Sequence, residues 1–130
     1  MDKSDLKVEL DQLERALSRF KEALARDPKK DDLAVDASIQ RFEFTYELCW
    51  KTLKRFLALE GFTLNSPKDV FKEAFRLGWL PEGDALWSQM LKDRNLTYHT
   101  YDEKIAAEVY HRIKTYPEPF SRLVKLLRAK

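Results

Sequence analysis

Apolar side chains recur every three or four positions through most of the chain, which is the spacing that places them on one face of an α-helix. In residues 6–24 this stripe consists of Leu6, Leu10, Leu13, Leu17, Phe20 and Leu24. Residues 32–60 form the longest periodic stretch, and they are apolar on more than one side around residues 42–48. The pattern predicts a long amphipathic helix, followed by a central helix that contacts several neighbours.

Shorter helices are predicted in the second half of the chain. Ser66, followed by a proline, is typical of a helix N-terminus, and Gly78 is typical of the position after a helix. The inner face of this helix is expected to be Val70, Phe71, Ala74 and Phe75. Further helices are expected to begin near Glu82 and near residues 102–103, and a terminal helical piece follows the prolines of residues 117–119.

The stretches between the predicted helices are short, so consecutive helices should pack as antiparallel neighbours. Only three glycines and five prolines occur in the 130 residues, which leaves few turn residues for a sheet-rich fold. The expected fold is therefore all-α, an up-and-down antiparallel helical bundle with four to five main helices. It is expected to form a single domain over residues 1–130.

Composition and charge narrow the class of protein without identifying a ligand. The net charge is only +2, from 24 basic and 22 acidic residues, which neither supports nor excludes RNA as a partner. A single cysteine, Cys49, rules out an internal disulfide and fits a reducing compartment. No apolar run approaches the roughly 18 residues of a membrane span, and the N-terminus does not resemble a signal peptide. We therefore expect a cytoplasmic protein that does not enter a membrane.

One segment concentrates polar and aromatic side chains suited to chemistry. Within eight positions it holds Arg94, His99 and Tyr101, with Asn95, Thr97 and Thr100 between them. An imidazole accepts or donates a proton near neutral pH, and a guanidinium pairs with phosphate oxygens. Together they are the minimum set for phosphodiester transfer to an adjacent ribose 2′-hydroxyl. If the helix continues through the segment, Arg94 and His99 point to one place.

Such cleavage requires both a base and an acid, but the segment contains only one histidine. A two-fold symmetric dimer would bring a second His99 and a second Arg94 to the same cleft. The segment therefore favours a composite site in a homodimer. The apolar excess of residues 42–48 also permits association into a higher oligomer.

These residues also resemble a known family. The pattern formed by Arg94, His99 and Tyr101 resembles the R-x4-6-H signature of HEPN domains, in the form with a tyrosine two residues on. The stretches QRFEFTYELCWK at residues 40–51 and DRNLTYHTY at residues 93–101 resemble the branch of nucleotidyltransferase substrate-binding proteins, or HepT toxins. The resemblance covers roughly residues 32–116.

The resemblance implies a dimeric helical bundle that acts as a metal-independent endoribonuclease toxin. It implies a minimal nucleotidyltransferase as the antitoxin partner and RNA as the substrate. Arg94 and His99 would carry cleavage, with Asn95 or Thr97 in support. Tyr101 matches the tyrosine that the partner modifies with AMP, and a charged adenylate there would block the cleft and repel RNA.

A second function stays open at this stage. The older family name implies a non-catalytic subunit that presents a nucleotide or protein substrate to the nucleotidyltransferase. The presence of Arg94, His99 and Tyr101 together favours the enzyme, whereas the modest net charge mildly favours the adaptor. His111, on a predicted helix, is interpreted as a surface or packing residue. No cofactor is expected, and no spacing of histidines and carboxylates suggests a metal site.

Plainer structural roles are also open for the charged residues. Arg94 would form an ion pair with Asp93, Asp102 or Glu103, and His99 would hydrogen bond a carbonyl at a helix end. Glu43 and Glu47 share a helix face, and pairing with Arg41 or Lys51 is favoured over action as general bases. A further alternative is that Glu47 lies beneath Arg94 and orients it.

Overall fold

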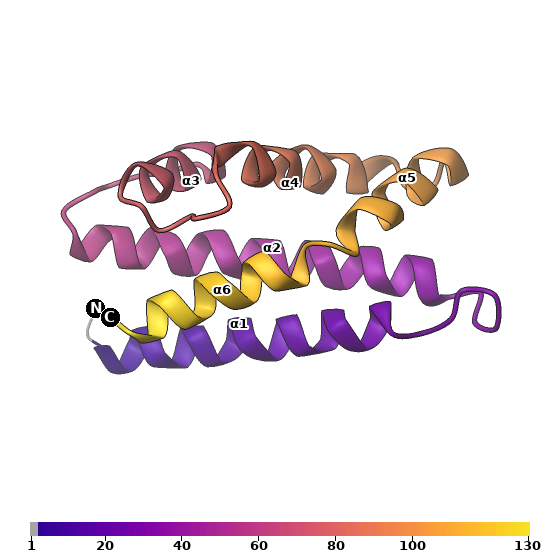
Figure 1. Ribbon diagram of the computed structural model, residues 1–130, viewed down its shortest axis with the longest axis horizontal. Coiled ribbons are helices and arrows are strands. Elements are labelled where there is room, and N and C mark those ends of the chain that lie inside the picture. The colour runs from indigo at the N-terminus through magenta and orange to yellow at the C-terminus, as the bar shows by residue number, and fades with distance from the viewer. Residues whose placement is uncertain (1–2) are drawn as a thin grey trace.

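A computed structural model describes residues 3–130, and all regular structure in this range is helical (Figure 1). The helices are α1 Lys3–Leu24, α2 Ala34–Leu59, α3 Pro67–Arg76, α4 Asp84–Leu96, the 3-10 helix η1 Thr97–His99, α5 Glu103–Ile113 and α6 Pro117–Arg128. The predicted all-α class is confirmed. The terminal helical piece is a full helix of 12 residues, so residues 3–130 contain six α-helices.

Helix α2 is the centre of the bundle, as the apolar pattern predicted. It runs antiparallel to α1 on one side, and α3, α4 and α5 follow one another along its other side (Figure 1). Helix α6 packs against α1 and brings the end of the chain back towards the beginning of α1. Because α2 contacts both groups of helices, it is buried on more than one side.

Local signals explain where the shorter helices begin and end. The Ser66 hydroxyl accepts a hydrogen bond from the Asp69 backbone N–H at 3.2 Å, which caps α3 as predicted. Gly78 adopts a φ of 79° immediately beyond the helix, a left-handed conformation that favours glycine. Helix α4 begins two residues later than expected, at Asp84.

The predicted inner face of α3 is correct for three of its four residues. Val70, Phe71 and Ala74 are buried, but Phe75 is 44% exposed. Position 75 lies at the edge of the apolar stripe, where a helix of 3.6 residues per turn carries it away from α2. The exposure of Phe75 is therefore a correction to the sequence prediction.

Aromatic side chains from five helices join in the middle of the core. Phe71 of α3 stacks on Trp87 of α4 with ring centroids 4.9 Å apart, and Phe120 of α6 meets Trp87 edge to face at 5.6 Å. The chain of contacts continues through Phe20, Phe42, Tyr46 and Tyr116. Offset-stacked and edge-to-face pairs contribute about 0.5–1.5 kcal/mol each beyond area burial. This cluster fixes α4 against α2, and α4 carries the predicted functional segment.

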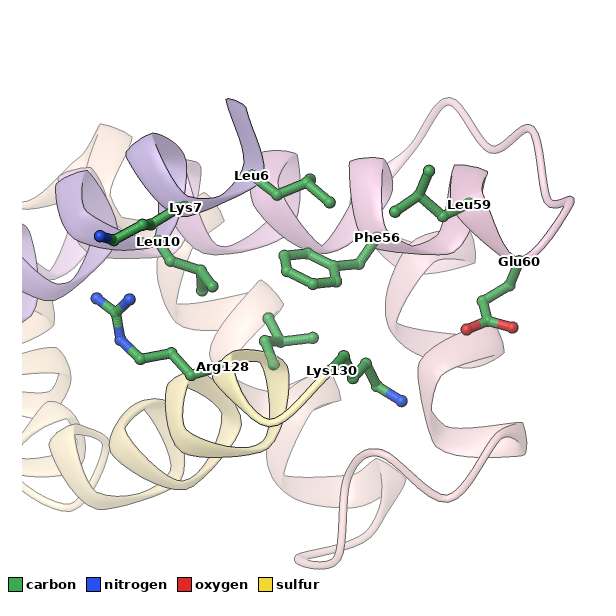
Figure 2. Close-up of a pocket in the computed structure, with 9 residues that line it drawn as sticks. Leu6, Lys7, Leu10, Phe56, Leu59, Glu60, Arg128 and Lys130 are labelled. Atoms are coloured by element: carbon green, nitrogen blue, oxygen red, sulfur yellow. The ribbon is translucent and has the colours of Figure 1, made fainter. Parts of the chain in front are cut away.

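A pocket lies at the end of the bundle where the chain begins and ends (Figure 2). It has a volume of about 500 Å³ and is formed between α1, α2 and α6, with Leu10 and Phe56 among its apolar walls. Phe56 is nine residues beyond Glu47 on α2, or about 14 Å along the helix axis. This pocket is therefore separate from the functional segment, whose contact with α2 is at Glu47. No helix within residues 3–130 is long and apolar enough to cross a membrane.

The free energy of unfolding is expected to fall as the pH rises above about 9. Burial raises the pKa of the Cys49 thiol and of the Tyr46 hydroxyl, and burial together with a hydrogen bond to Asp93 raises the pKa of Tyr116. These groups stay protonated in the folded chain but ionise near their ordinary pKa when it unfolds. The free energy of unfolding is therefore unaffected by these groups below their unfolded pKa values. Above those values it falls by about 1.4 kcal/mol per pH unit for each group.

Urea titrations between pH 7 and 11 measure this effect. The Tyr46→Phe variant should show a shallower decline above pH 10 than the wild type, because it lacks one ionising hydroxyl. An unfolding free energy that stays constant to pH 11 would contradict the burial of these groups.

Candidate active site

The functional segment lies at the junction where α4 gives way to η1. The Thr97 hydroxyl donates a hydrogen bond to the Arg94 carbonyl oxygen at 2.6 Å, and the Thr100 hydroxyl donates to the Thr97 carbonyl oxygen at 3.1 Å. Both hydroxyls bond to carbonyl oxygens of the preceding turn, and the Arg94 carbonyl also accepts a backbone N–H at the end of α4. Asp102 then caps α5 by accepting a hydrogen bond from the Lys104 backbone N–H at 2.9 Å. Thr97 therefore shapes the backbone of the segment.

Arg94 is held by a carboxylate from the central helix. Its Nη2 lies 2.5 Å from Oε1 of Glu47, and the two side chains are 23% and 27% exposed. The other oxygen of this carboxylate, Oε2, accepts a hydrogen bond from the indole Nε1–H of Trp50 at 3.1 Å. Lys51 Nζ lies 4.0 Å from the same oxygen. The ion pair predicted for Arg94 with Asp93, Asp102 or Glu103 is therefore wrong, and the alternative that placed Glu47 beneath Arg94 is confirmed.

The remaining contacts of Arg94 come from its own segment. Its Nη1 donates to the Asn95 side-chain oxygen at 3.3 Å, and its guanidinium carbon lies 6.0 Å from the centre of the Tyr98 ring. The Nε atom is buried without a hydrogen-bond partner among the described residues. Since a guanidinium has five N–H donors, each Nη keeps one for an incoming anion.

His99 and Tyr101 form the exposed part of the segment. The His99 Nδ1 atom lies 3.5 Å from the Tyr101 hydroxyl oxygen, and the rings meet edge to face with centroids 6.1 Å apart. Tyr101 is 83% exposed. The plainer interpretation of His99, a hydrogen bond to a carbonyl, is wrong for its side chain. No hydrogen bond joins Arg94 to His99 within residues 3–130, and the two side chains make separate contacts, Arg94 with Glu47 and His99 with Tyr101.

Asp93 was considered only as a possible partner of Arg94, and its burial against other helices was not predicted from the sequence. Asp93 is completely buried, and its Oδ1 lies 2.8 Å from Nε and 2.7 Å from Nη2 of Arg112. Its Oδ2 accepts a 2.5 Å hydrogen bond from the Tyr116 hydroxyl. The hydrogen bond to Asp93 raises the pKa of Arg112. Asp93 therefore joins the end of α4 to α5 and to the start of α6.

The other titratable residues considered from the sequence differ in their contacts and exposure. Glu47 pairs with Lys51 as well as with Arg94, whereas the Glu43 carboxylate has no ion pair among the described residues. His111 is exposed on α5, in agreement with its interpretation as a surface residue. Within residues 3–130, no group of three or more histidine, cysteine or acidic side chains is arranged to hold a metal ion. The described segment presents one guanidinium and one imidazole.

A known protein family matches nearly the whole chain. The family is described as "nucleotidyltransferase substrate binding protein like", and it matches residues 8–129. A Haemophilus influenzae protein named probable ribonuclease HepT is 36% identical over 103 residues, which are 75% of this chain and 69% of the relative. The family match includes α2 and the segment from Arg94 to Tyr101.

Solved structures give the same result for the fold. A Thermus thermophilus protein is 38% identical with a TM-score of 0.82, over 89% of this chain and 98% of the other. A Haemophilus influenzae protein, described as having the fold of a nucleotidyltransferase substrate binding domain, is 29% identical with a TM-score of 0.70, over 96% and 98%. A tri-AMPylated Shewanella oneidensis HEPN toxin in complex with an MNT antitoxin is 18% identical with a TM-score of 0.76, over 100% of both chains, and shares the fold.

Proposed function

This chain belongs to the nucleotidyltransferase substrate-binding family, in the HepT-like branch of the HEPN superfamily, and on that premise we propose that it is a metal-independent endoribonuclease toxin. The observation that carries the proposal is that one short segment at the α4–η1 junction holds both a guanidinium fixed by Glu47 and an exposed imidazole beside Tyr101. A phosphate in the RNA backbone would meet the free N–H donors of Arg94. His99, five residues further along the chain, is exposed to solvent and is available for proton transfer.

In the proposed reaction, the ribose 2′-hydroxyl attacks the adjacent phosphorus and the bond to the leaving 5′-oxygen breaks. His99 accepts the proton of the 2′-hydroxyl or supplies a proton to the leaving oxygen, and Arg94 stabilises the charge that develops on the phosphoryl oxygens. Asn95 supports the Arg94 side chain, and Thr97 supports its backbone.

Two histidines are needed if one acts as base and the other as acid, and a homodimer supplies the second. Exposed aromatic side chains near Arg94 support this part of the proposal. Tyr98 is 64% exposed and lies against the Arg94 guanidinium. Phe44 is 46% exposed and precedes Glu47 by three residues, which places it on the same face of α2. Covering such aromatic surface is typical of a protein interface.

We further propose that a minimal nucleotidyltransferase silences the toxin by attaching AMP to Tyr101. The support is the 3.5 Å separation between the Tyr101 hydroxyl and the His99 imidazole. An adenylate on that hydroxyl would add a negative phosphate beside His99 and repel the RNA backbone. The high exposure of Tyr101 leaves its hydroxyl accessible to a partner enzyme.

One experiment tests cleavage and silencing together. Purified wild-type chain and the Tyr101→Phe variant are incubated with RNA in EDTA, before and after treatment with the partner nucleotidyltransferase and ATP. Both should cleave RNA at first, since the proposed reaction assigns no proton transfer to the hydroxyl of Tyr101. After treatment the wild type should lose its activity and gain one or more AMP masses, whereas Tyr101→Phe should stay active.

Loss of activity by treated Tyr101→Phe would contradict the assignment of Tyr101. If neither protein cleaves RNA before treatment, and mass spectrometry shows that the wild type carries no AMP, the ribonuclease function is wrong. The adaptor function, in which the chain presents a substrate to the nucleotidyltransferase, would then replace it.

A further inference from the structure

The carboxylate of Glu47 is placed to control the direction of the Arg94 guanidinium. The two side chains come from helices that are far apart in sequence, and their charged atoms lie 2.5 Å apart. Both are about three-quarters buried, so the ion pair is screened less by solvent than a pair on the open surface. A long arginine side chain loses considerable rotamer freedom when it is held in this way. The pair therefore selects one arrangement of Arg94 before any substrate binds.

The Glu47 carboxylate is itself held by a hydrogen bond from Trp50 on the same helix. Its Oε2 accepts the Trp50 indole hydrogen bond at 3.1 Å, and this leaves Oε1 directed at Arg94. Trp50 packs against the hydrophobic core, and Glu47 and Trp50 lie one turn apart on the same helix. Trp50 is therefore held by the core, Glu47 is held by Trp50, and Arg94 is held by Glu47.

The pair leaves part of the guanidinium available for a ligand. Glu47 engages Nη2 and Asn95 engages Nη1, whereas Nε is buried. One N–H donor on each Nη remains, and these are the donors that bind two oxygens of a phosphate side by side. A carboxylate at this position therefore holds Nη2 without occupying every donor of the guanidinium.

We infer that Glu47 is a positioning residue for cleavage, which holds the Arg94 guanidinium in the orientation that receives the scissile phosphate. This inference rests on the proposed ribonuclease function, and it assigns no proton transfer to Glu47. A misplacement of a positioned group by about 1 Å can lower the rate by about 100-fold. Because the contact acts on the orientation of Arg94 as charge develops, its removal should lower kcat more than it raises KM.

The test compares kcat and KM of the wild type with those of Glu47→Gln, Glu47→Asp and Glu43→Gln. Glu47→Gln should lower kcat by up to about 100-fold, and Glu47→Asp should recover part of the loss because it keeps the charge. Glu43→Gln is the matched control, since Glu43 lies one turn earlier on α2 and its carboxylate has no ion pair among the described residues. Its activity should equal that of the wild type.

A double-mutant cycle separates positioning from a general structural effect. In an Arg94→Ala background, Glu47→Gln should cause no further loss of activity, because the residue acts through Arg94. An equal loss in both backgrounds would overturn the inference, as would unchanged kcat in the single variant. Thermal unfolding of each variant checks that the folded fraction is the same.

A measurement without RNA keeps the inference testable if the ribonuclease function fails. In ¹⁵N NMR spectra of the wild type, the Nη groups of Arg94 should rotate slowly, and this slow rotation should be lost in Glu47→Gln but kept in Glu43→Gln. Arg94→Ala identifies the resonance. If the wild type does not cleave RNA but this pattern is seen, the function is wrong and the positioning of Arg94 by Glu47 stands. If the rotation of Arg94 is unaffected by Glu47→Gln, the positioning is wrong.

Discussion

Replacement of His99 by alanine is expected to lower RNA cleavage in EDTA by about 10²- to 10⁴-fold, the range typical of a lost general acid or base. Replacement of Arg94 by alanine is expected to cost about 10²- to 10³-fold, as for other donors that stabilise charge in a transition state. In a composite dimeric site each variant removes two copies of the side chain. Initial rates on a labelled single-stranded RNA measure both effects.

Two exposed residues supply matched controls for these variants. His111→Ala removes the other histidine, which lies on the surface of α5 away from the α4–η1 junction. Arg15→Ala removes an exposed arginine of α1. Both should cleave RNA at the wild-type rate. If either control loses activity as strongly as the variant at its matched site, the catalytic assignment of Arg94 and His99 is wrong.

The proposed dimeric site also predicts how fast mixed dimers cleave RNA. Mixed dimers of wild-type and His99→Ala subunits carry one intact histidine and two intact arginines. If the two histidines act as base and acid in one composite site, these mixed dimers should be inactive, so an excess of His99→Ala subunits should lower the activity of the wild type. Mixed dimers that keep about half of the wild-type activity, in a mixture shown by mass spectrometry to contain them, would favour a site within one chain.

The largest effect on stability is expected from Asp93→Ala. This change removes the partner of two groups at once, the Arg112 guanidinium and the Tyr116 hydroxyl. Breaking a buried ion pair by removing one partner costs about 3–5 kcal/mol. Arg112 is 32% exposed and regains some water, so the lower end of that range, about 3 kcal/mol, is expected here. Urea denaturation followed by circular dichroism measures the loss.

Two further variants identify the source of the loss. Tyr116→Phe removes only the hydrogen bond to Asp93 and should cost about 1.5–3 kcal/mol, the value for a bond to a charged group. Glu22→Ala removes an exposed acidic residue of α1 and should change the unfolding free energy by less than about 0.5 kcal/mol. If Asp93→Ala is no less stable than Glu22→Ala, the buried network contributes nothing to the fold.

The sequence by itself determined the features that depend on local spacing. The apolar period located the helices, because burial of one helix face requires an apolar residue every three or four positions. Ser66 and Gly78 located the ends of α3, because a cap acts on backbone groups within a few residues. The motif of Arg94, His99 and Tyr101 was visible for the same reason, since its members lie within eight positions.

Only the tertiary structure decided which charged residues meet. Asp93 and Arg94 are adjacent in sequence, yet Asp93 is buried against Arg112 and Tyr116, and Arg94 turns to Glu47. Neighbouring positions on a helix point about 100° apart, so each side chain is paired by whichever helix packs against its own side. The packing of α4 between α2 and α5 sets those partners, and it depends on contacts between residues far apart in the chain. The choice of Glu47 over nearer carboxylates therefore could not be made from spacing alone.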